Sequence, residues 1–263
     1  ASRGAVHTSP PFPGERRQKS ASAQASGPFE FAGRTHEAIC GLSHFDHKYS
    51  FDWIGNSTPW VAPVNVYDFN RVPEPAWDYA NRELSEKNHT KQDAAYGAVR
   101  LSIADPVTLI LGGRFTHIDR SGAGWASLDN VYDYDKRKFI PYAGLVYDFT
   151  PNYSVYASYT SIFNYQDYRD RNGSWLDPIE GDAYEVGIKG EFLEGGLNAS
   201  LAVFKIEQDN LGQQDVGHVV PGTDSPAYYE TEGATSQGAE FEISGQLVEN
   251  WNLFFFATRY SAK

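Results

Sequence analysis

Three deficits in the 263-residue sequence narrow the classes of protein to which it can belong. Cys40 is the only cysteine, so an internal disulfide and a cysteine-based metal site are both excluded. Basic residues are scarce, with 22 Lys and Arg against 34 Asp and Glu, and this net charge of −12 argues against a nucleic-acid partner. No apolar run is long enough for a transmembrane helix, and the mean hydropathy is −0.50.

Methionine is absent as well, so the sequence holds no initiator residue, and no signal peptide opens it. We therefore expect a fragment or a processed piece of a longer protein. Catalytic motifs are also missing: there is no GxSxG elbow, P-loop, HExxH helix or cysteine cluster. We expect neither an enzyme nor a protein with a resident cofactor.

Against these deficits, residues 182–208 carry a strong pattern that predicts a β-hairpin. Tyr184, Val186 and Ile188 share one face of the first strand by period-two alternation, and a Gly-rich turn at 194–196 leads into a second alternating strand. Each strand is about a dozen residues long, whereas soluble strands average about 5–6. Strands of about 9–11 residues with one apolar face are typical of tilted membrane-spanning strands.

The same unit recurs along the chain and predicts roughly ten strands in all. Short turns are expected near residues 33, 105, 150, 195 and 249. The segments between the hairpins, 47–93 and 209–233 among them, are expected to be loops of about 20 to 45 residues. Strict alternation of short and long connections is typical of outer-membrane barrels, with short periplasmic turns and long extracellular loops. A soluble sandwich mixes its connection lengths, and a propeller blade needs four short strands per repeat.

The predicted fold class is therefore all-β, an antiparallel up-and-down transmembrane β-barrel that is present only in part. Residues 1–19 contain Pro10, Pro11 and Pro13 and no periodicity, so we expect them to be irregular. Residues 20–263 are expected to form the barrel domain.

Two clusters of polar residues raise the question of a metal site. On a strand, His36 and His44 would lie roughly 26 Å apart, so they cannot bind one ion together with His47. The acidic stretch 167–182 lacks the spacing of an EF-hand loop, and we expect its carboxylates to be solvated. The sequence therefore predicts no metal site.

Three segments resemble a known family when they are taken in order. They are DAAYGAVRLSIADPVTLILGGRFTHID, FIPYAGLVYDFTPNYSVYASYTSIF and GDAYEVGIKGEFLEGGLNASLAVFKIEQDN. They resemble the barrel of TonB-dependent siderophore receptors, and the similarity covers about residues 20–260. The resemblance implies a barrel of about 22 strands that is plugged by an N-terminal domain. It also implies the outer membrane of a Gram-negative cell, with ferric siderophore, the TonB complex and outer-membrane lipid as partners.

From the sequence as it stands we expect two departures from that family. They are the lack of a plug domain or TonB box before residue 20 and the lack of the family's terminal aromatic strand after residue 260. About ten strands cannot close a barrel of the family's diameter, and an open sheet leaves polar edges that lipid does not tolerate. We therefore expect uptake of ferric siderophores, energised by TonB, to belong to the parent protein, with iron present only as cargo.

Loop aromatics and arginines are the expected ligand-binding groups, because a ferric siderophore is a bulky chelate that needs stacking surface and hydrogen-bonding or cationic partners. The candidates are Arg114, Trp125, Tyr165, Tyr168, Arg169, Arg171 and Trp175. Other aromatics, such as Phe115, Tyr147 and Tyr159, are expected to form membrane-interface girdles instead.

Two other functions remain open from the sequence. A passive porin-type channel would form a smaller closed barrel with a constriction loop and no high-affinity ligand. A soluble β-sandwich carbohydrate-binding module would have shorter strands and connections of mixed length.

Overall fold

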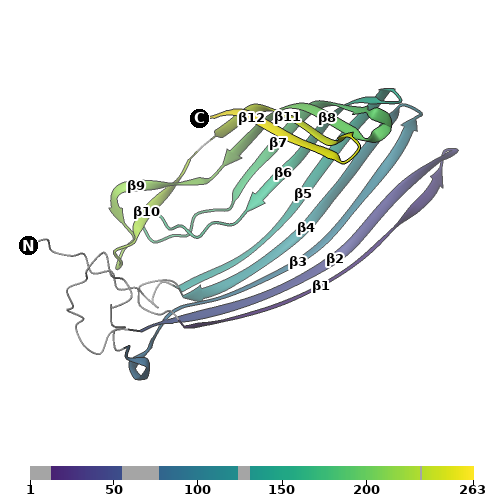
Figure 1. Ribbon diagram of the computed structural model, residues 1–263. Coiled ribbons are helices and arrows are strands. Elements are labelled where there is room, and N and C mark those ends of the chain that lie inside the picture. The colour runs from purple at the N-terminus through teal and green to yellow at the C-terminus, as the bar shows by residue number, and fades with distance from the viewer. Residues whose placement is uncertain (1–12, 55–76, 124–130, 232) are drawn as a thin grey trace, which may run out of the picture. The chain divides into compact units, whose positions relative to one another are not determined.

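The computed structural model describes residues 13–54, 77–123, 131–231 and 233–263, without the side chains of 131 and 132. Within these residues the chain forms twelve strands and two short 3₁₀ helices (Figure 1). The strands are β1 (Gly14–Phe31), β2 (Arg34–Trp53), β3 (Glu83–Ala104), β4 (Val107–Ala123), β5 (Val131–Thr150), β6 (Tyr153–Asn164), β7 (Ile179–Phe192), β8 (Leu197–Asp209), β9 (Leu211–Val219), β10 (Pro226–Thr231), β11 (Ala234–Val248) and β12 (Trp251–Ala262). The 3₁₀ helices are η2 (Tyr79–Asn81) and η3 (Leu193–Gly195). None of the described helices is long and apolar enough to cross a membrane.

Ten of the strands form one sheet in the order β1-β2-β3-β4-β5-β6-β7-β8-β11-β12, and β9 and β10 form a separate two-stranded sheet. The pairs from β5 to β8 and from β8 through β11 to β12 are antiparallel. β1 and β12 each have a neighbour on one side only, so the described sheet is open. The structure confirms the predicted all-β, antiparallel up-and-down arrangement of about ten barrel strands.

Two compact units divide the chain, and each is described by itself. Unit 1 comprises residues 1–21, 44–92 and 118–136. Unit 2 comprises residues 22–43, 93–117 and 137–263.

All five predicted short turns are present, and all of them lie in unit 2. Three of them need left-handed backbone. Ala32 and Gly33 have φ of 50° and 75°, Asn250 has φ of 65°, and residues 193–195 have φ of 52°, 55° and 90°. Glycine and asparagine adopt this conformation more readily than other residues, which is why such sequences turn there. The third hairpin turns at Pro151, whose missing N–H cannot continue a ladder.

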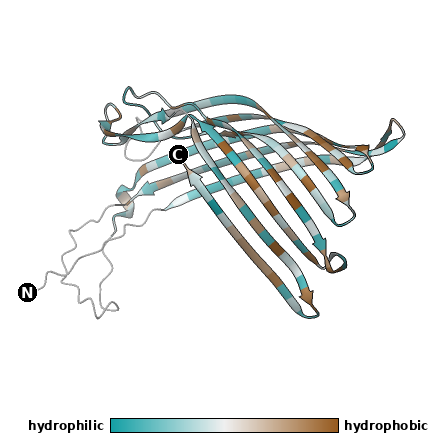
Figure 2. Cartoon of the chain, turned by 90° about the horizontal axis from the view of Figure 1, so that it is seen from above, coloured by the Kyte–Doolittle hydropathy of each residue, from teal (hydrophilic) through white to brown (hydrophobic). Residues whose placement is uncertain are grey.

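One face of the sheet in unit 2 is apolar and exposed. The register places Val186 of β7 opposite Val203 of β8 and Ile188 opposite Leu201. These side chains are 40–56% exposed, although each would stabilise the fold if it were buried. Such a contiguous exposed apolar surface is the face that a membrane barrel presents to lipid, and the alternation is visible along the strands in Figure 2.

Aromatic rings lie at two levels along β6 and β7, one at the short turns and one near the middle of the strands. Tyr153 stacks on Phe149 at 6.0 Å and meets Phe192 edge-on at 5.7 Å, close to the short turns. Near the middle of the same strands, the Tyr159 ring lies 5.4 Å from Tyr184. Amphipathic rings at two levels along a strand are typical of the aromatic girdles of membrane proteins.

The opposite face of the sheet is polar, and tyrosine rings cover its glycines. On β6, the Tyr156 ring lies over Gly187, where a Cβ atom would approach a ring carbon to 2.6 Å. The Tyr156 hydroxyl donates to Glu185 at 2.5 Å, and the Lys189 ammonium lies 4.8 Å from the ring centroid. The glycine thus makes room for a ring that carries a hydrogen-bonding group on the barrel's inner surface.

The structure corrects three boundaries. β1 begins at Gly14, so residues 14–19, which were expected to be irregular, are extended. β2 continues to Trp53 and β3 begins at Glu83, so the predicted loop 47–93 is strand at both ends. The predicted loop 209–233 contains the β9–β10 hairpin.

Candidate functional site

The β6–β7 loop and the β9–β10 hairpin pack against each other in unit 2. We call residues 165–178 and 209–231 together the loop platform. Its first part leads into β7, whose other end carries the short turn at η3, so the platform lies at the end of β7 that is opposite to the short turns. In outer-membrane barrels the long-loop end faces the outside of the cell.

Main-chain hydrogen bonds join the two parts of the platform. The Tyr228 N–H donates to the Arg169 carbonyl at 2.8 Å, and the Asp177 N–H donates to the Glu230 carboxylate at 2.6 Å. The loop is itself folded back, because the Leu176 N–H donates to the Tyr168 carbonyl at 3.0 Å. The platform is therefore an ordered element that holds its side chains in fixed positions.

Gln166 is the polar residue at the junction of the two parts, and only 7% of it is exposed. Its amide nitrogen donates to the carbonyls of Asp177 (2.5 Å) and Asn210 (2.6 Å). Its amide oxygen accepts from the Gly212 N–H at 3.1 Å. One buried side chain thus satisfies three backbone groups, each of which would be costly to leave without a partner.

One aromatic pair and one cation–π pair supply ring surface to the platform. The Tyr168 and Tyr228 rings stack with centroids 4.0 Å apart and planes at 21°, which links the loop to β10. The Arg169 guanidinium lies 4.1 Å from the centroid of the Trp175 ring. Tyr165 and Tyr168 are each 41% exposed, so they offer ring surface to a ligand.

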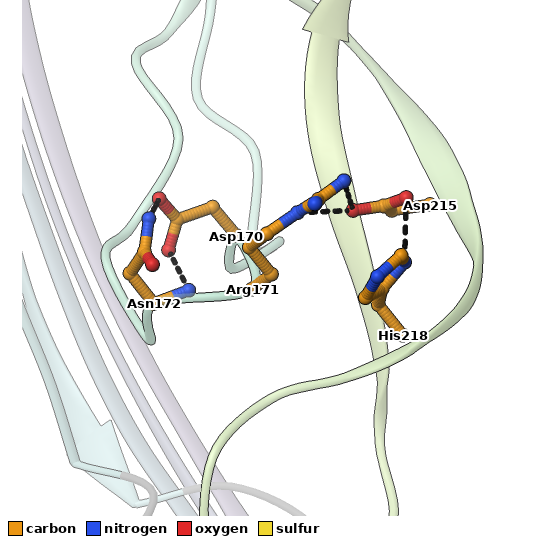
Figure 3. A network of polar contacts seen from close by, with 5 residues as sticks. All are labelled: Asp170, Arg171, Asn172, Asp215 and His218. Carbon is orange, nitrogen blue, oxygen red and sulfur yellow. Dashed lines mark hydrogen bonds and ion pairs between the residues drawn. The ribbon is translucent and has the colours of Figure 1, made fainter.

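A charged network links the loop to β9, as Figure 3 shows. Arg171 donates through Nε (2.8 Å) and Nη2 (2.6 Å) to one oxygen of Asp215. His218 places Nδ1 3.0 Å from the other oxygen. The Asp215 side chain is only 11% exposed, so the Arg171 guanidinium compensates a largely desolvated carboxylate and His218 adds a second polar contact.

Asp170 holds the tip of the loop through its carboxylate, which accepts from the Asn172 N–H at 2.9 Å (Figure 3). The same carboxylate accepts from the Ser174 N–H at 2.7 Å. Desolvation by itself would raise the pKa of Asp170, but these hydrogen bonds outweigh it and hold the pKa below the usual 3.8. A carboxyl with a depressed pKa stabilises the fold above its unfolded pKa and loses that contribution as the pH falls through the folded pKa.

We therefore expect the loop tip to be unaffected between pH 7 and pH 5 and to loosen below about pH 4. Fluorescence of Trp175, compared with that of a Trp175→Phe variant, would report the change. Asp170→Asn should show the loosened signal already at neutral pH. A signal that changed at the same low pH in wild type and in Asp170→Asn would contradict this role for the carboxylate.

Five of the seven predicted ligand-binding residues are brought together in the platform: Tyr165, Tyr168, Arg169, Arg171 and Trp175. Arg114 instead lies within β4, two residues from the buried Thr116. Trp125 lies outside the described residues. Sequence reasoning did not predict any site residue in the second part of the platform, residues 209–231. The adjacent aromatic residues Tyr228 and Tyr229 could have indicated it.

Two of the polar residues that were considered as metal ligands have other partners. His36 is buried, with Nε2 3.0 Å from the Phe31 carbonyl and Nδ1 accepting from the Ser102 N–H at 3.0 Å, so both ring nitrogens have partners. In the acidic stretch, Glu180 pairs with Lys138. Among the described residues, no group of three or more His, Cys, Asp or Glu is arranged to hold a metal ion.

Unit 1 contains a separate cavity of about 910 Å³. Its lining carries charges of both signs, with Lys48 and Lys87 against Asp119 and Asp133. Tyr49, which also lines it, belongs to a row of rings at every second position of β2, spaced by 5.6–6.3 Å: Phe45, His47, Tyr49 and Phe51. The volume is within the usual range for ligand pockets.

Comparison of the sequence and the structure with known proteins identifies a family of outer-membrane receptors. Residues 4–263 match the family model "TonB dependent receptor-like, beta-barrel". The chain is 36% identical to the ferric-pyoverdine 358 receptor of Pseudomonas putida over 245 residues, which cover 91% of this chain and 29% of that protein. It is also 36% identical to the ferripyoverdine receptor of Pseudomonas aeruginosa, with 92% and 29% covered.

Solved structures agree with the sequence comparison. The ferripyoverdine receptor of Pseudomonas aeruginosa bound to ferripyoverdine superposes with a TM-score of 0.82 at 32% identity. The superposition covers 96% of this chain and 33% of that one. The chain therefore spans about three tenths of the length of the curated relatives that it matches.

Proposed function

Because the chain belongs to the TonB-dependent receptor-like β-barrel family, we propose that it forms part of the barrel of a receptor that binds a ferric siderophore and imports it with energy from TonB. Receptors of this family lie in the outer membrane of Gram-negative bacteria, and this chain is an outer-membrane protein of that kind. The observation that carries the proposal is the loop platform, which presents stacked aromatic rings at the end of the strands opposite to the short turns.

The binding step follows from the chemistry of the platform. A ferric siderophore buries its metal inside a chelate whose outer surface is aromatic or amide-like. The exposed rings of Tyr165 and Tyr168 supply stacking surface for such a ligand, and Trp175 with Arg169 supplies a cation-carrying ring. Preorganisation of these rings reduces the side-chain entropy that is lost on binding.

No bond is made or broken in this function, so the chain acts as a transporter component and not as an enzyme. Iron enters as cargo within the chelate, and no resident cofactor takes part. Outer-membrane lipid contacts the exposed apolar face that includes Val186 and Val203. Coupling to TonB belongs to a plug domain of the whole receptor, because the strands described here supply barrel wall.

The two alternatives receive no support from the relatives, which are siderophore receptors and neither passive channels nor carbohydrate-binding modules. The twelve-residue and longer strands of the ten-stranded sheet also differ from those of a typical soluble sandwich.

Replacing Tyr165, Arg169 and Trp175 together by alanine in the intact receptor should weaken binding of its ferric siderophore by roughly tenfold or more, because each residue supplies contact surface or charge to the platform. Affinity is measured from the quenching of receptor fluorescence by the iron chelate, with correction for the lost tryptophan. Trp251→Ala is the matched control, because Trp251 is an exposed aromatic beside a short turn. An unchanged affinity in the triple variant would rule out the platform as the binding surface.

A further inference from the structure

The charge of the loop platform points to the class of chelate that it accepts. Seven carboxylates and only two arginines lie in residues 165–178 and 209–231. We infer that the platform selects ferric chelates that are neutral or carry a cationic group, such as trihydroxamates, and discriminates against polyanionic chelates such as tris-catecholates. This inference rests on the proposed function and adds a ligand class to it.

The first step concerns Arg171, which the sequence alone offers as a partner for an anionic ligand. Two of its nitrogens are bonded to Asp215, at 2.6 and 2.8 Å. Turning the guanidinium towards a ligand would leave the largely desolvated Asp215 carboxylate with only His218 beside it. Breaking a desolvated charge pair is costly, so Arg171 is retained as a structural link between the loop and β9.

The second step concerns Arg169. Its guanidinium lies over the Trp175 ring, and its carbonyl accepts the Tyr228 N–H that joins the loop to β10. Partial burial lowers the pKa of Arg169, because desolvation disfavours the charged form. The Arg169 cation therefore faces the Trp175 ring and not the position of a ligand.

The third step concerns the carboxylates. Asp215 is neutralised within its network and Asp170 is ionised at the loop tip, where hydrogen bonds depress its pKa. Five other acidic residues of the platform are exposed: Asp167, Asp177, Asp209, Asp224 and Glu230. Exposed like charges within about 10 Å, one Debye length at 0.1 M salt, repel an approaching anion.

These steps give a platform that carries exposed acidic residues together with exposed tyrosine rings. An Fe³⁺ trihydroxamate is neutral at the metal centre, so it stacks on the rings without electrostatic cost, and an ammonium on its chain is attracted both to the carboxylates and to the ring faces. An Fe³⁺ tris-catecholate is a trianion, and the same surface repels it. The negative charge of the platform therefore favours neutral or cationic ferric chelates over polyanionic ones.

The test uses a series of ligands that differ only in charge. Ferrioxamine B carries one terminal ammonium; N-acetylation makes the complex neutral, and N-succinylation makes it anionic. Affinity of the intact purified receptor for each complex, and for the trianionic ferric enterobactin, is measured by fluorescence quenching at low and at high salt. We expect affinity to fall about two- to fivefold for each negative charge added to the ligand, and the difference to shrink at high salt.

Matched variants connect the preference to the platform. Asp167→Asn with Asp224→Asn removes two exposed charges, with little change of shape, and should reduce the discrimination against the succinylated ligand about threefold. Glu194→Gln with Glu249→Gln removes the same charge at the short turns, roughly 40 Å away along β7 for Glu194, and should change nothing.

The outcomes separate the inference from the proposed function. Binding that ignores ligand charge, or that favours the succinylated ligand or ferric enterobactin, overturns the inference and leaves a siderophore receptor in place. The same result follows if both double variants alter selectivity equally. The absence of saturable binding for every ferric chelate overturns the proposed function together with the inference.

Discussion

Replacing Gln166 by methionine is expected to weaken binding of the ferric siderophore roughly tenfold or more while the barrel still folds. Methionine has a similar length and fits an apolar site, but it neither donates to the carbonyls of Asp177 and Asn210 nor accepts well from the Gly212 N–H. Three backbone groups then lose their partner at a junction that water hardly reaches, and each loss costs about 1–3 kcal/mol.

The consequence is a shift in the population of the docked platform. Without the three Gln166 hydrogen bonds, the stacked arrangement of Tyr168 and Tyr228 is less populated in the free receptor. Part of the ligand's binding free energy is then used to re-form that arrangement. Gln166 touches no ligand in this scheme and acts as a positioning residue. Gln166→Glu should behave almost as badly, because an ionised oxygen would face the two carbonyls that the amide nitrogen now serves.

The measurement is siderophore affinity together with folding in the same preparation. Gln246→Met is the matched control, since the Gln246 side chain is exposed on β11 beside a short turn, outside the platform, and the same change there should leave affinity unaltered. A purely structural role for Gln166 would lower the yield of folded receptor in proportion to activity. The positioning role instead predicts folded receptor with reduced affinity, and the hydrogen exchange of the Gly212 amide should rise in the variant. Normal affinity in Gln166→Met would contradict it.

The parts of the fold that could be predicted from the sequence are those in which one face contacts lipid. In β7 and β8, apolar residues recur at every second position between tight turns, so the period reveals both the strands and their register. The ends of β2 and β3 were missed for a different reason. The last residues of β2 do alternate, with rings at every second position against Lys48 and Asp52, but the prolines at 59, 63, 73 and 75 favour a loop over the whole stretch 47–93 when only the sequence is considered.

The candidate site was predicted in its residue types but not in its contacts. Aromatic and arginine side chains in 165–175 were recognisable, whereas the partner of Arg171 lies 44 positions further along the chain. β9 and β10 were missed for the same reason. Hydrogen bonds to the β6–β7 loop stabilise this hairpin, and no local sequence pattern predicts those bonds. The period of apolar residues indicates which face of a strand is apolar, but it does not indicate which loops contact each other.

Gly245→Ala is expected to be among the most destabilising single substitutions in the sheet. Gly245 has φ of 141°, a backbone conformation that residues with a Cβ rarely adopt. A Cβ atom added there would lie 2.2 Å from the carbonyl oxygen of Gly196 and 2.9 Å from the Cα of Leu197. Both are backbone atoms of the β7–β8 turn, so neither can rotate away as a side chain would.

The same carbonyl of Gly196 accepts the Gln246 N–H at 2.7 Å, so relieving the overlap would also break the hydrogen bond that fastens β11 to this turn. Strain and the lost bond together should cost about 3 kcal/mol or more. The folded fraction of the intact receptor, read as heat-modifiable mobility on a denaturing gel, and its urea midpoint would both fall.

Gly27→Ala supplies the control that makes this prediction specific. Gly27 lies in β1, and a Cβ atom added there meets no heavy atom within 4 Å. A methyl group there should leave the urea midpoint unchanged or raise it slightly, since alanine loses less backbone entropy than glycine on folding. If both variants unfolded at the wild-type midpoint, the close approach of β11 to the β7–β8 turn would not exist in the folded receptor. If only Gly245→Ala were unstable, the instability would come from that approach and not from the loss of a glycine as such.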